Sequence, residues 1–143
     1  MGKILTINNI CKSFKDHQVL KNINIEIDRK GEIFGLIGVN GIGKTTLIKI
    51  ILDLLNADQG AVEIFGLNSA DNQSRANLAY LPEKFQPSQY LKGTEFLNIA
   101  CQHFNKNYNH QEAIKLAEQL DLNPAALNER IGKYSKGMGL KLG

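Results

Sequence analysis

The sequence has few of the residues that cross-link a chain or anchor it in a membrane. Its two cysteines, Cys11 and Cys101, match no metal-binding or redox spacing, so two free thiols in a reducing compartment are expected. The longest apolar run, Leu47–Leu55, is too short for a membrane span and contains two charged residues. The amino terminus has no apolar core of a secretory signal. We therefore expect a cytoplasmic chain that reaches a membrane only through a partner.

The sequence also has no block of basic residues. Seventeen Lys and Arg stand against fourteen Asp and Glu, which gives a net charge of +3. Charge this small and scattered does not indicate nucleic-acid binding, whereas it is compatible with a small anionic ligand. The 43% of hydrophobic residues and 22% of charged residues are ordinary for a globular protein, and 143 residues suit one domain with a real core.

The first part of the chain reads as strands followed by a core helix. Isoleucine-rich, partly alternating stretches predict strands at 3–10 and 19–27, with the polar KSFKDH at 12–17 as the turn between them. The near-continuous apolar run GEIFGLIG at 31–38 is typical of a strand buried on both faces of a parallel sheet. The stretch 44–55 is apolar almost all round, which predicts a helix packed into the core.

Two further short strands are expected before the character of the sequence changes. One lies at 60–66 between glycines, and the other lies at 77–82, where Pro82 ends it. We expect a β-rich part with the phosphate-binding core at 1–84 and a helical part at 85–143.

Three helices are predicted in the second part. Thr94 is the expected cap of the first, Asn109 with Glu112 gives the second a start that resembles a capping box, and Pro124 stands at the first position of the third. The apolar stripes expected to face the core are Phe96, Ile99, Ala100 and Phe104 on the first helix and Ala113, Leu116, Ala117 and Leu120 on the second.

The stretch GVNGIGKTT, at 38–46, matches the phosphate-binding loop pattern G-x-x-x-x-G-K-[ST]. Glycines allow the backbone to come close to a bulky anion, and successive N–H groups then point at it, with the positive end of the following helix behind them. Lys44 can reach the β and γ phosphates, the Thr45 hydroxyl can coordinate Mg²⁺, and Thr46 can bond a neighbouring phosphate oxygen. The glycines of the loop are Gly38, Gly41 and Gly43.

The setting of the loop strengthens this interpretation. It follows a strand of the buried type and opens an apolar helix, which is the context that the motif requires. The alternative is a glycine-rich turn between strand and helix with a chance Lys-Thr pair. Because pattern and context agree independently, the sequence predicts a site for a nucleoside triphosphate with Mg²⁺.

The order and spacing of four stretches resemble the ATP-binding cassette of ABC transporters over essentially the whole chain. They are the loop itself, the preceding VLKNINIEIDRKGEIFGLIG, the strand end YLPE and the late YSKGM, and the last two are most similar to cassettes of bacterial exporters. The resemblance implies an α/β P-loop NTPase fold and Mg-ATP binding that powers transport by separate transmembrane permease subunits. It also implies a second ATP-binding subunit in a head-to-tail dimer.

The resemblance implies roles for individual residues. Phe14 matches an aromatic that stacks on adenine, although a phenylalanine of a core or turn fits the sequence equally. Glu83 stands where the family usually has a glutamine that contacts Mg²⁺, and a carboxylate can ligate that ion; a solvated glutamate after a strand is the alternative. The family's phosphate and magnesium site corresponds to Gly38, Asn40, Gly41, Gly43, Lys44, Thr45 and Thr46.

The segment at the end of the chain resembles the family's signature motif, usually L-S-G-G-Q, whose serine and glycine amides bind the γ-phosphate held by the opposite subunit. The corresponding residues are Ser135, Lys136, Gly137 and Met138. Lys136 replaces a glycine, but the segment still offers a hydroxyl, backbone donors and a cation to phosphate. Taken alone, a polar loop that ends a helical segment explains these residues as well.

After the signature, the family has an Asp-Glu strand that binds Mg²⁺ and polarises the attacking water, and then a histidine. The histidines of this sequence, at 17, 103 and 110, all precede the signature. The expectation is a cassette truncated after the signature, with an incomplete sheet that is unstable alone or needs a second chain. Such a chain would hold ATP weakly and hydrolyse it far more slowly than an intact cassette.

Two other functions are compatible with the phosphate loop. One is a nonhydrolytic regulatory module that pairs with an intact cassette through YSKGM, or a nonfunctional fragment. The other is a small nucleotide kinase or a GTPase, which is disfavoured because the sequence has no guanine-reading N-K-x-D motif and no arginine-rich lid.

Overall fold

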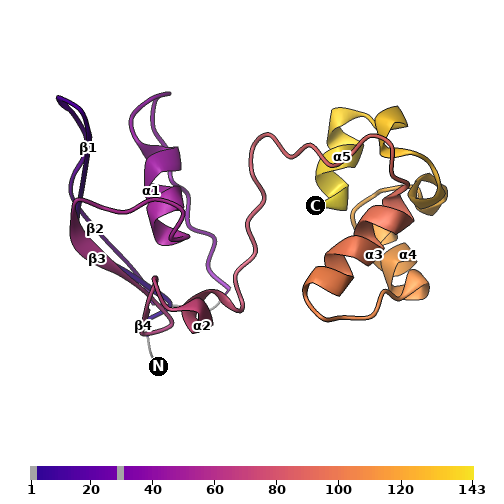
Figure 1. Cartoon of the computed structure of the whole chain (residues 1–143), viewed down its shortest axis with the longest axis horizontal. Coiled ribbons are helices and arrows are strands. Elements are labelled where there is room, and N and C mark those ends of the chain that lie inside the picture. The colour runs from indigo at the N-terminus through magenta and orange to yellow at the C-terminus, as the bar shows by residue number, and fades with distance from the viewer. Residues whose placement is uncertain (1–2, 29–30) are drawn as a thin grey trace. The chain divides into compact units, whose positions relative to one another are not determined.

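The structure is a computed structural model that describes residues 3–28 and 31–143. The chain forms two compact units, of which the first extends to Ala79 and the second begins at Tyr80 (Figure 1). The first unit contains the strands and one longer helix, whereas the second is helical.

The first unit is built on a four-stranded antiparallel sheet with the order β2-β1-β3-β4. Its strands are β1 (Leu5–Phe14), β2 (His17–Ile27), β3 (Gln59–Ile64) and β4 (Leu67–Asn68). The strands expected at 3–10, 19–27 and 60–66 are therefore confirmed, as β1, β2 and β3.

The turn between β1 and β2 is shorter than the sequence indicated. Lys12, Ser13 and Phe14, which were expected to lie in a turn at 12–17, pair with residues of β2, and Phe14 lies opposite His17. The connection is reduced to two residues, and Lys15 adopts a left-handed φ of 52°. Polar composition misled the prediction because an exposed hairpin end tolerates charged side chains on both strands.

Helix α1 (Lys44–Ile51) packs on the sheet and closes the core of the first unit. The buried residues of this core are Ile7, Ile10, Leu20, Leu47, Ile50, Val62 and Ile64. The helix ends four residues before the predicted position 55. Asp53 takes a left-handed φ of 57°, and the Leu54 N–H bonds back to the Lys49 carbonyl at 2.8 Å, which terminates the helical ladder.

The strand predicted at 31–38 is not formed, and this prediction was wrong for the structure described. Residues 32–39 run without ladder pairing, and Ile33 and Ile37 are 100% and 95% exposed. A strand buried on both faces needs a neighbour on each side. The four strands of the described sheet pair only with one another, so within residues 3–28 and 31–143 no strand is available to this segment.

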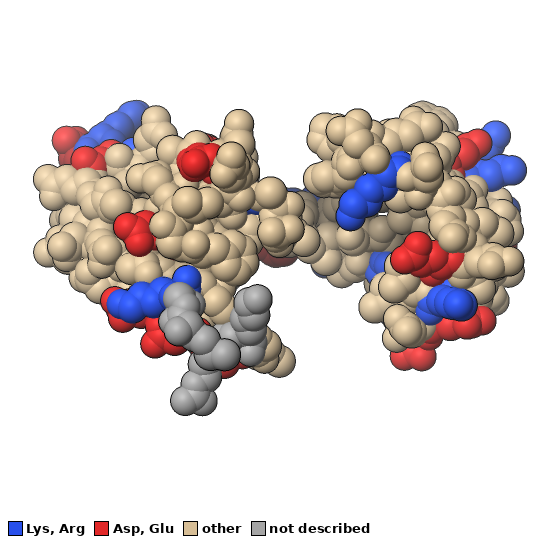
Figure 2. Space-filling view, turned by 90° about the horizontal axis from the view of Figure 1, so that it is seen from below, with Lys and Arg blue, Asp and Glu red and all other residues tan. Residues whose placement is uncertain are grey.

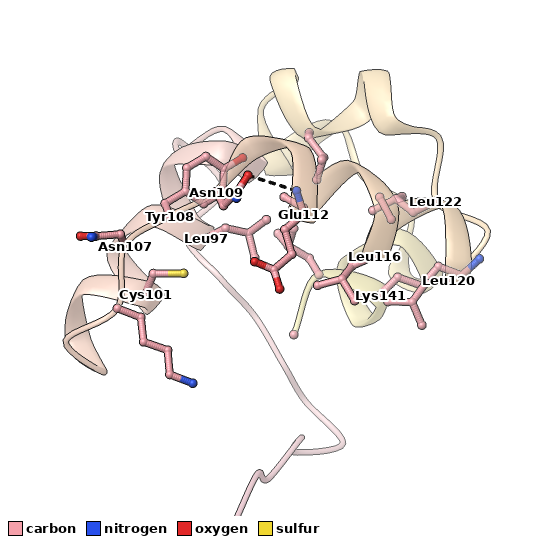
Figure 3. A pocket seen from close by; sticks show the side chains of 16 residues that line it. Leu97, Cys101, Asn107, Tyr108, Asn109, Glu112, Leu116, Leu120, Leu122 and Lys141 are labelled. Atoms are coloured by element: carbon pink, nitrogen blue, oxygen red, sulfur yellow. Dashed lines mark hydrogen bonds between the residues drawn. The ribbon is translucent and has the colours of Figure 1, made fainter.

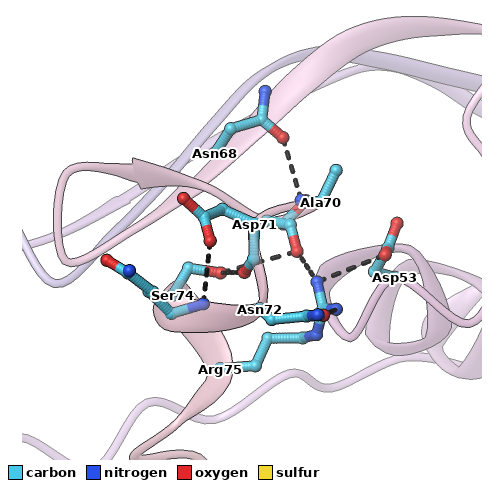
Figure 4. Close-up of polar contacts among 9 residues, drawn as sticks. Asp53, Asn68, Ala70, Asp71, Asn72, Ser74 and Arg75 are labelled. Carbon is cyan, nitrogen blue, oxygen red and sulfur yellow. Dashed lines mark hydrogen bonds and ion pairs between the residues drawn. The ribbon is translucent and has the colours of Figure 1, made fainter.

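A polar network joins β4 and the short helix α2 (Asn72–Arg75) to the end of α1 (Figure 4). Asp71 caps α2 by accepting from the Gln73 N–H at 2.9 Å, and the Arg75 guanidinium reaches Asp53 at 3.2 Å. The same guanidinium donates to the Ser69 carbonyl. The strand predicted at 77–82 does not form after this network; the segment is irregular.

The second unit packs three α-helices and two short 3₁₀ helices around one core. The elements are α3 (Gly93–His103), α4 (His110–Gln119), η1 (Pro124–Asn128), η2 (Ile131–Lys133) and α5 (Lys136–Leu142). The buried residues are Ala113, Ala117, Leu122, Ala126, Leu127, Ile131 and Leu142. None of the helices that the structure describes is long and apolar enough to cross a membrane.

The helix starts agree with the sequence in two cases of three. Asn109 caps α4, since its side chain accepts from the N–H groups of Gln111 and Glu112. Asn123 caps the helix that begins at Pro124, but that helix is a 3₁₀ helix. Thr94 is not a cap, because α3 begins at Gly93 and Lys92 is in the N-cap position.

The predicted apolar stripes are only partly buried. Ile99 and Phe104 of the first stripe are exposed, whereas Leu97 of the same helix packs against the core. On α4, Leu116 and Leu120 are half exposed and line an apolar groove of about 390 Å³ together with side chains of α3 (Figure 3). On both helices the buried face is displaced from the predicted stripe, toward Leu97 on α3 and toward Ile114 on α4.

The cap of α4 provides a test of the second unit. Asn109→Ala leaves two N–H groups of the first turn without an acceptor, and we expect the unit to lose about 1 kcal/mol of stability. The four tyrosines, Tyr80, Tyr90, Tyr108 and Tyr134, all lie in this unit and the chain has no tryptophan, so tyrosine fluorescence during urea unfolding reports on it selectively.

The matched control for this substitution is Asn107→Ala, two residues earlier and outside the helix. Its unfolding midpoint is expected to stay at that of the unsubstituted chain. Equal midpoints for the two variants would show that the Asn109 side chain does not stabilise α4.

Candidate functional site

Residues 38–46 form a curved loop that leads directly into α1. Two of its glycines have backbone conformations that side chains disfavour: φ is +82° at Gly41 and +108° at Gly43. A Cβ added to Gly43 would lie 2.8 Å from Val19 Cγ1 and 2.9 Å from Leu20 Cδ2. Both the conformation and the lack of space therefore require glycine at position 43.

Lys44 is the first residue of α1 and folds back over the loop. Its Nζ donates to the carbonyl of Gly38 at 2.6 Å and to that of Val39 at 2.8 Å. The ammonium group is thus held inside the curve of the loop by two neutral acceptors. An anion that enters the curve would offer it a charged acceptor, which makes stronger hydrogen bonds than a carbonyl does.

The amino end of α1 provides further donors beside this ammonium. The N–H groups of Lys44, Thr45 and Thr46 have no acceptor within the helix, because they belong to its first turn. Gly43 has no side chain to cap them, and the first turn contains no acidic residue. The partial positive charge of the helix end is consequently available to an anion.

The remaining predicted residues of the loop lie in the same curve of the chain. Asn40 and Gly41 form its exposed turn. A Cβ on Gly38 would lie 3.1 Å from Ile42 Cγ2, so a side chain at this position would press on the loop. The structure therefore brings together Gly38, Asn40, Gly41, Gly43, Lys44, Thr45 and Thr46 within the first unit.

Phe14 lies at the end of β1 and is 47% exposed, which is not the environment of a core phenylalanine. Lys12, on the same strand, places Nζ 5.7 Å from the centroid of its ring. Asp58 pairs with this ammonium at 2.7 Å and also accepts from the Ser13 N–H at 2.6 Å. The hydrogen bond from Lys12, followed by that from Ser13, holds the pKa of Asp58 below its usual value.

Lys12 and Asp58 were not predicted from the sequence. For Lys12 a signal was present, because residues two apart on one strand share a face of the sheet and Lys12 precedes Phe14 by two. No such signal exists for Asp58, since its contact depends on β1 and β3 lying side by side.

Glu83 and the signature segment belong to the second unit. Glu83, Ser135 and Lys136 line one cleft of about 570 Å³. Ser135 is the N-cap of α5, and its Oγ accepts a hydrogen bond from the Met138 N–H at 3.2 Å. This hydrogen bond fixes the Ser135 side chain at the start of the helix. Gly137 is exposed, whereas the Met138 side chain packs against the core of the unit.

Tyr134 fixes the start of this segment. Its hydroxyl donates to the Ala126 carbonyl at 2.6 Å, and burial raises the pKa of the phenol. The anchoring of Tyr134 and the Ser135 cap together place the polar residues of the segment at the cleft.

Acidic and basic side chains are interspersed on the face shown in Figure 2. Within the described part of the chain, no group of three or more His, Cys, Asp or Glu side chains is close enough to hold a metal ion. A metal at the phosphate loop would therefore take ligands such as the Thr45 hydroxyl and the oxygens of a bound phosphate.

The comparisons with known proteins agree with these features. A sequence model of the ABC transporter family matches residues 20–143. The uncharacterized ABC transporter ATP-binding protein YxlF of Bacillus subtilis is 31% identical over 142 residues, which are 98% of this chain and 46% of that protein. The chain thus spans about half the length of this relative.

Two solved structures have the same fold. The ATP-binding subunit of an ABC transporter is 30% identical with a TM-score of 0.81, over 97% of this chain and 59% of the other. The dimeric cassette MJ0796 has a TM-score of 0.79 at 21% identity, over 96% of this chain and 66% of the other. These likenesses confirm the predicted P-loop cassette fold, in which the described sheet is partial. The chain belongs to the ATP-binding cassette family of ABC transporters.

Proposed function

We propose that this chain binds Mg-ATP at residues 38–46 as part of the ATP-binding subunit of an ABC transporter, which powers transport by separate membrane subunits. The observation that supports this most directly is the Lys44 ammonium held inside the loop by two carbonyls, beside the uncapped amino end of α1. The cation and the helix end both belong to the start of α1, and a polyphosphate is a ligand that can accept hydrogen bonds from both.

In this proposal each residue of the site has one task. The loop N–H groups and Lys44 bind the β and γ phosphates, Thr46 bonds a neighbouring oxygen, and Thr45 coordinates Mg²⁺. Phe14 stacks on adenine with its exposed ring face. Glu83, in the place of the family's glutamine, is a second oxygen ligand of Mg²⁺.

The second unit has its own role in the proposal. Ser135, Lys136, Gly137 and Met138 contact the γ-phosphate held by a second ATP-binding subunit in a head-to-tail dimer. The related cassette MJ0796 is described as dimeric, which supports such pairing. The residues 1–84 and 85–143 are then two parts of one domain, and the membrane subunits are what hold the chain at the inner face of the membrane.

The first prediction concerns Lys44. We expect Lys44→Ala to weaken Mg-ATP binding by about 1.5–3 kcal/mol, because it removes a charge-assisted hydrogen bond. Isothermal titration calorimetry of the 143-residue chain measures this. Lys49→Ala, an exposed lysine on the same helix, is the control and should bind as the unsubstituted chain does. Equal losses for both lysines would contradict a specific role of Lys44.

The second prediction compares two glycines of the loop. Gly43→Ala introduces a Cβ that overlaps Val19 and Leu20, so we expect the loop to shift and Mg-ATP affinity to fall more than about tenfold. Gly41→Ala meets no atom within 4 Å and costs only the strain of a positive φ, about 1–2 kcal/mol. If Gly41→Ala were the more damaging of the two, the loop would not bind ATP in the conformation described.

The third prediction isolates the metal. Thr45→Val removes the hydroxyl and keeps the shape of the side chain, whereas Thr45→Ser keeps the hydroxyl. We expect Mg²⁺ to raise the ATP affinity of the valine variant less than that of the unsubstituted chain, because one protein ligand of the metal is gone while Glu83 and the phosphate oxygens remain. The serine variant should retain the magnesium dependence. A valine variant with the full magnesium dependence of the unsubstituted chain would show that Thr45 is not a metal ligand.

A further inference from the structure

A cation and a carboxylate support the exposed aromatic side chain at the end of β1. The Lys12 side chain is only 14% exposed, and its Nζ lies 5.7 Å from the Phe14 ring centroid, within the range of a cation–π contact. A lysine this shielded needs a partner for its charge. Asp58 is that partner, with a carboxylate oxygen 2.7 Å from the ammonium.

Asp58 is itself attached to β1 at three points. Besides Lys12, its carboxylate accepts the Ser13 N–H at 2.6 Å, and its own N–H donates to the Cys11 carbonyl at 2.9 Å. These bonds join the connection between α1 and β3 to the last residues of β1. The positions of Lys12 and of the strand that bears Phe14 are therefore fixed together.

The same residues lie close to the phosphate loop. Lys12 is paired with Leu20 of β2, and Leu20 packs so tightly on Gly43 that a Cβ there would come within 2.9 Å of it. One strand pair consequently holds both the aromatic ring and the beginning of α1. A change at Lys12 can reach the ring directly, whereas it reaches the phosphate loop only through the backbone of β2.

We propose that Lys12 and Asp58 are positioning residues that hold the Phe14 ring with one face against the ammonium and the other open to a purine base. This inference rests on the proposed binding of ATP at residues 38–46. A ring whose orientation is already fixed loses less side-chain freedom when a base stacks on it, so the pair strengthens binding of the base and leaves binding of the phosphates unchanged.

Inorganic tripolyphosphate separates the two parts of the ligand, because it offers the phosphates of ATP without a base. The test measures the affinity of the full 143-residue chain for Mg-ATP and for Mg-tripolyphosphate by calorimetry. Lys12→Met keeps the length of the side chain without its charge, and Asp58→Asn keeps an acceptor for the Ser13 N–H. We expect either substitution to weaken Mg-ATP binding about three- to tenfold and to leave tripolyphosphate binding unchanged.

An ion pair farther from Phe14 is the control. Lys3, just before β1, pairs with Glu26 of β2 at the end of the hairpin opposite Phe14. Lys3→Met and Glu26→Gln also remove one positive and one negative charge, and neither should change the affinity for ATP or for tripolyphosphate. Circular dichroism of all variants verifies that the sheet is retained.

Repeating the two substitutions in a chain that carries Phe14→Ala tests whether their effect depends on the ring. Without the ring, Lys12→Met and Asp58→Asn should cause no further loss of ATP affinity, because their effect acts through it. Equal losses for ATP and tripolyphosphate, or no loss for either, would overturn the positioning role. An unsubstituted chain that binds neither ligand would refute the proposed function itself, and this inference with it.

A spectroscopic measurement covers the case in which Lys12→Met folds poorly, because it needs only the Asp58 variant. The sequence has no tryptophan, so Phe14→Trp introduces a single reporter at the proposed stacking position. Its fluorescence should be quenched by Mg-ATP and unaffected by Mg-tripolyphosphate. Adding Asp58→Asn should shift the quenching midpoint to about three- to tenfold higher ATP. Quenching that is independent of Asp58 would overturn the inference.

Discussion

The site depends on the close approach of β2 to Gly43, the residue that precedes α1. Val19 and Leu20 lie so near Gly43 that no side chain fits there, and the backbone at Gly43 has a φ of +108°. This contact sets the direction in which α1 leaves the loop. If α1 began at another residue, the N–H groups of its first turn and the Lys44 ammonium would not both lie at the loop of residues 38–46.

The contact also relates the hydrophobic core to the polar site. Leu20 is buried with Leu47 and Ile50 of α1, so the packing that stabilises the first unit is the packing that seats the helix. Burial of such side chains contributes roughly 1.5–3 kcal/mol each. The position of the phosphate loop is therefore maintained by buried apolar residues outside the loop.

The sequence predicted those features that are encoded locally. The loop at 38–46, the cap at Asn109, the helix start at Pro124 and the strand at 60–66 each depend on a few neighbouring residues, and the structure has each of them. The roles of Phe14, Glu83 and the signature residues came from family resemblance and stay predictions. The contact of Asp58 with Lys12, which supports Phe14 in our proposal, was missed because the two residues are 46 positions apart in the chain and no local sequence pattern indicates such a contact.

The segment at 31–38 shows where local encoding stops. Its composition was interpreted as a strand buried on both faces, and the apolar pattern is real, yet several of its large side chains, such as Ile33 and Ile37, are exposed. A hydrophobic run indicates that burial of its side chains is favourable, but a strand forms only when neighbouring strands pair with its backbone N–H and C=O groups. The antiparallel strands that the structure describes are paired among themselves.

The phosphate loop begins directly after this unpaired segment. No sheet holds its upstream end; instead, the Lys44 ammonium bonds the Gly38 and Val39 carbonyls. Lys44 therefore bonds the upstream end of the loop in this structure, in addition to the task at the phosphates that we propose for it.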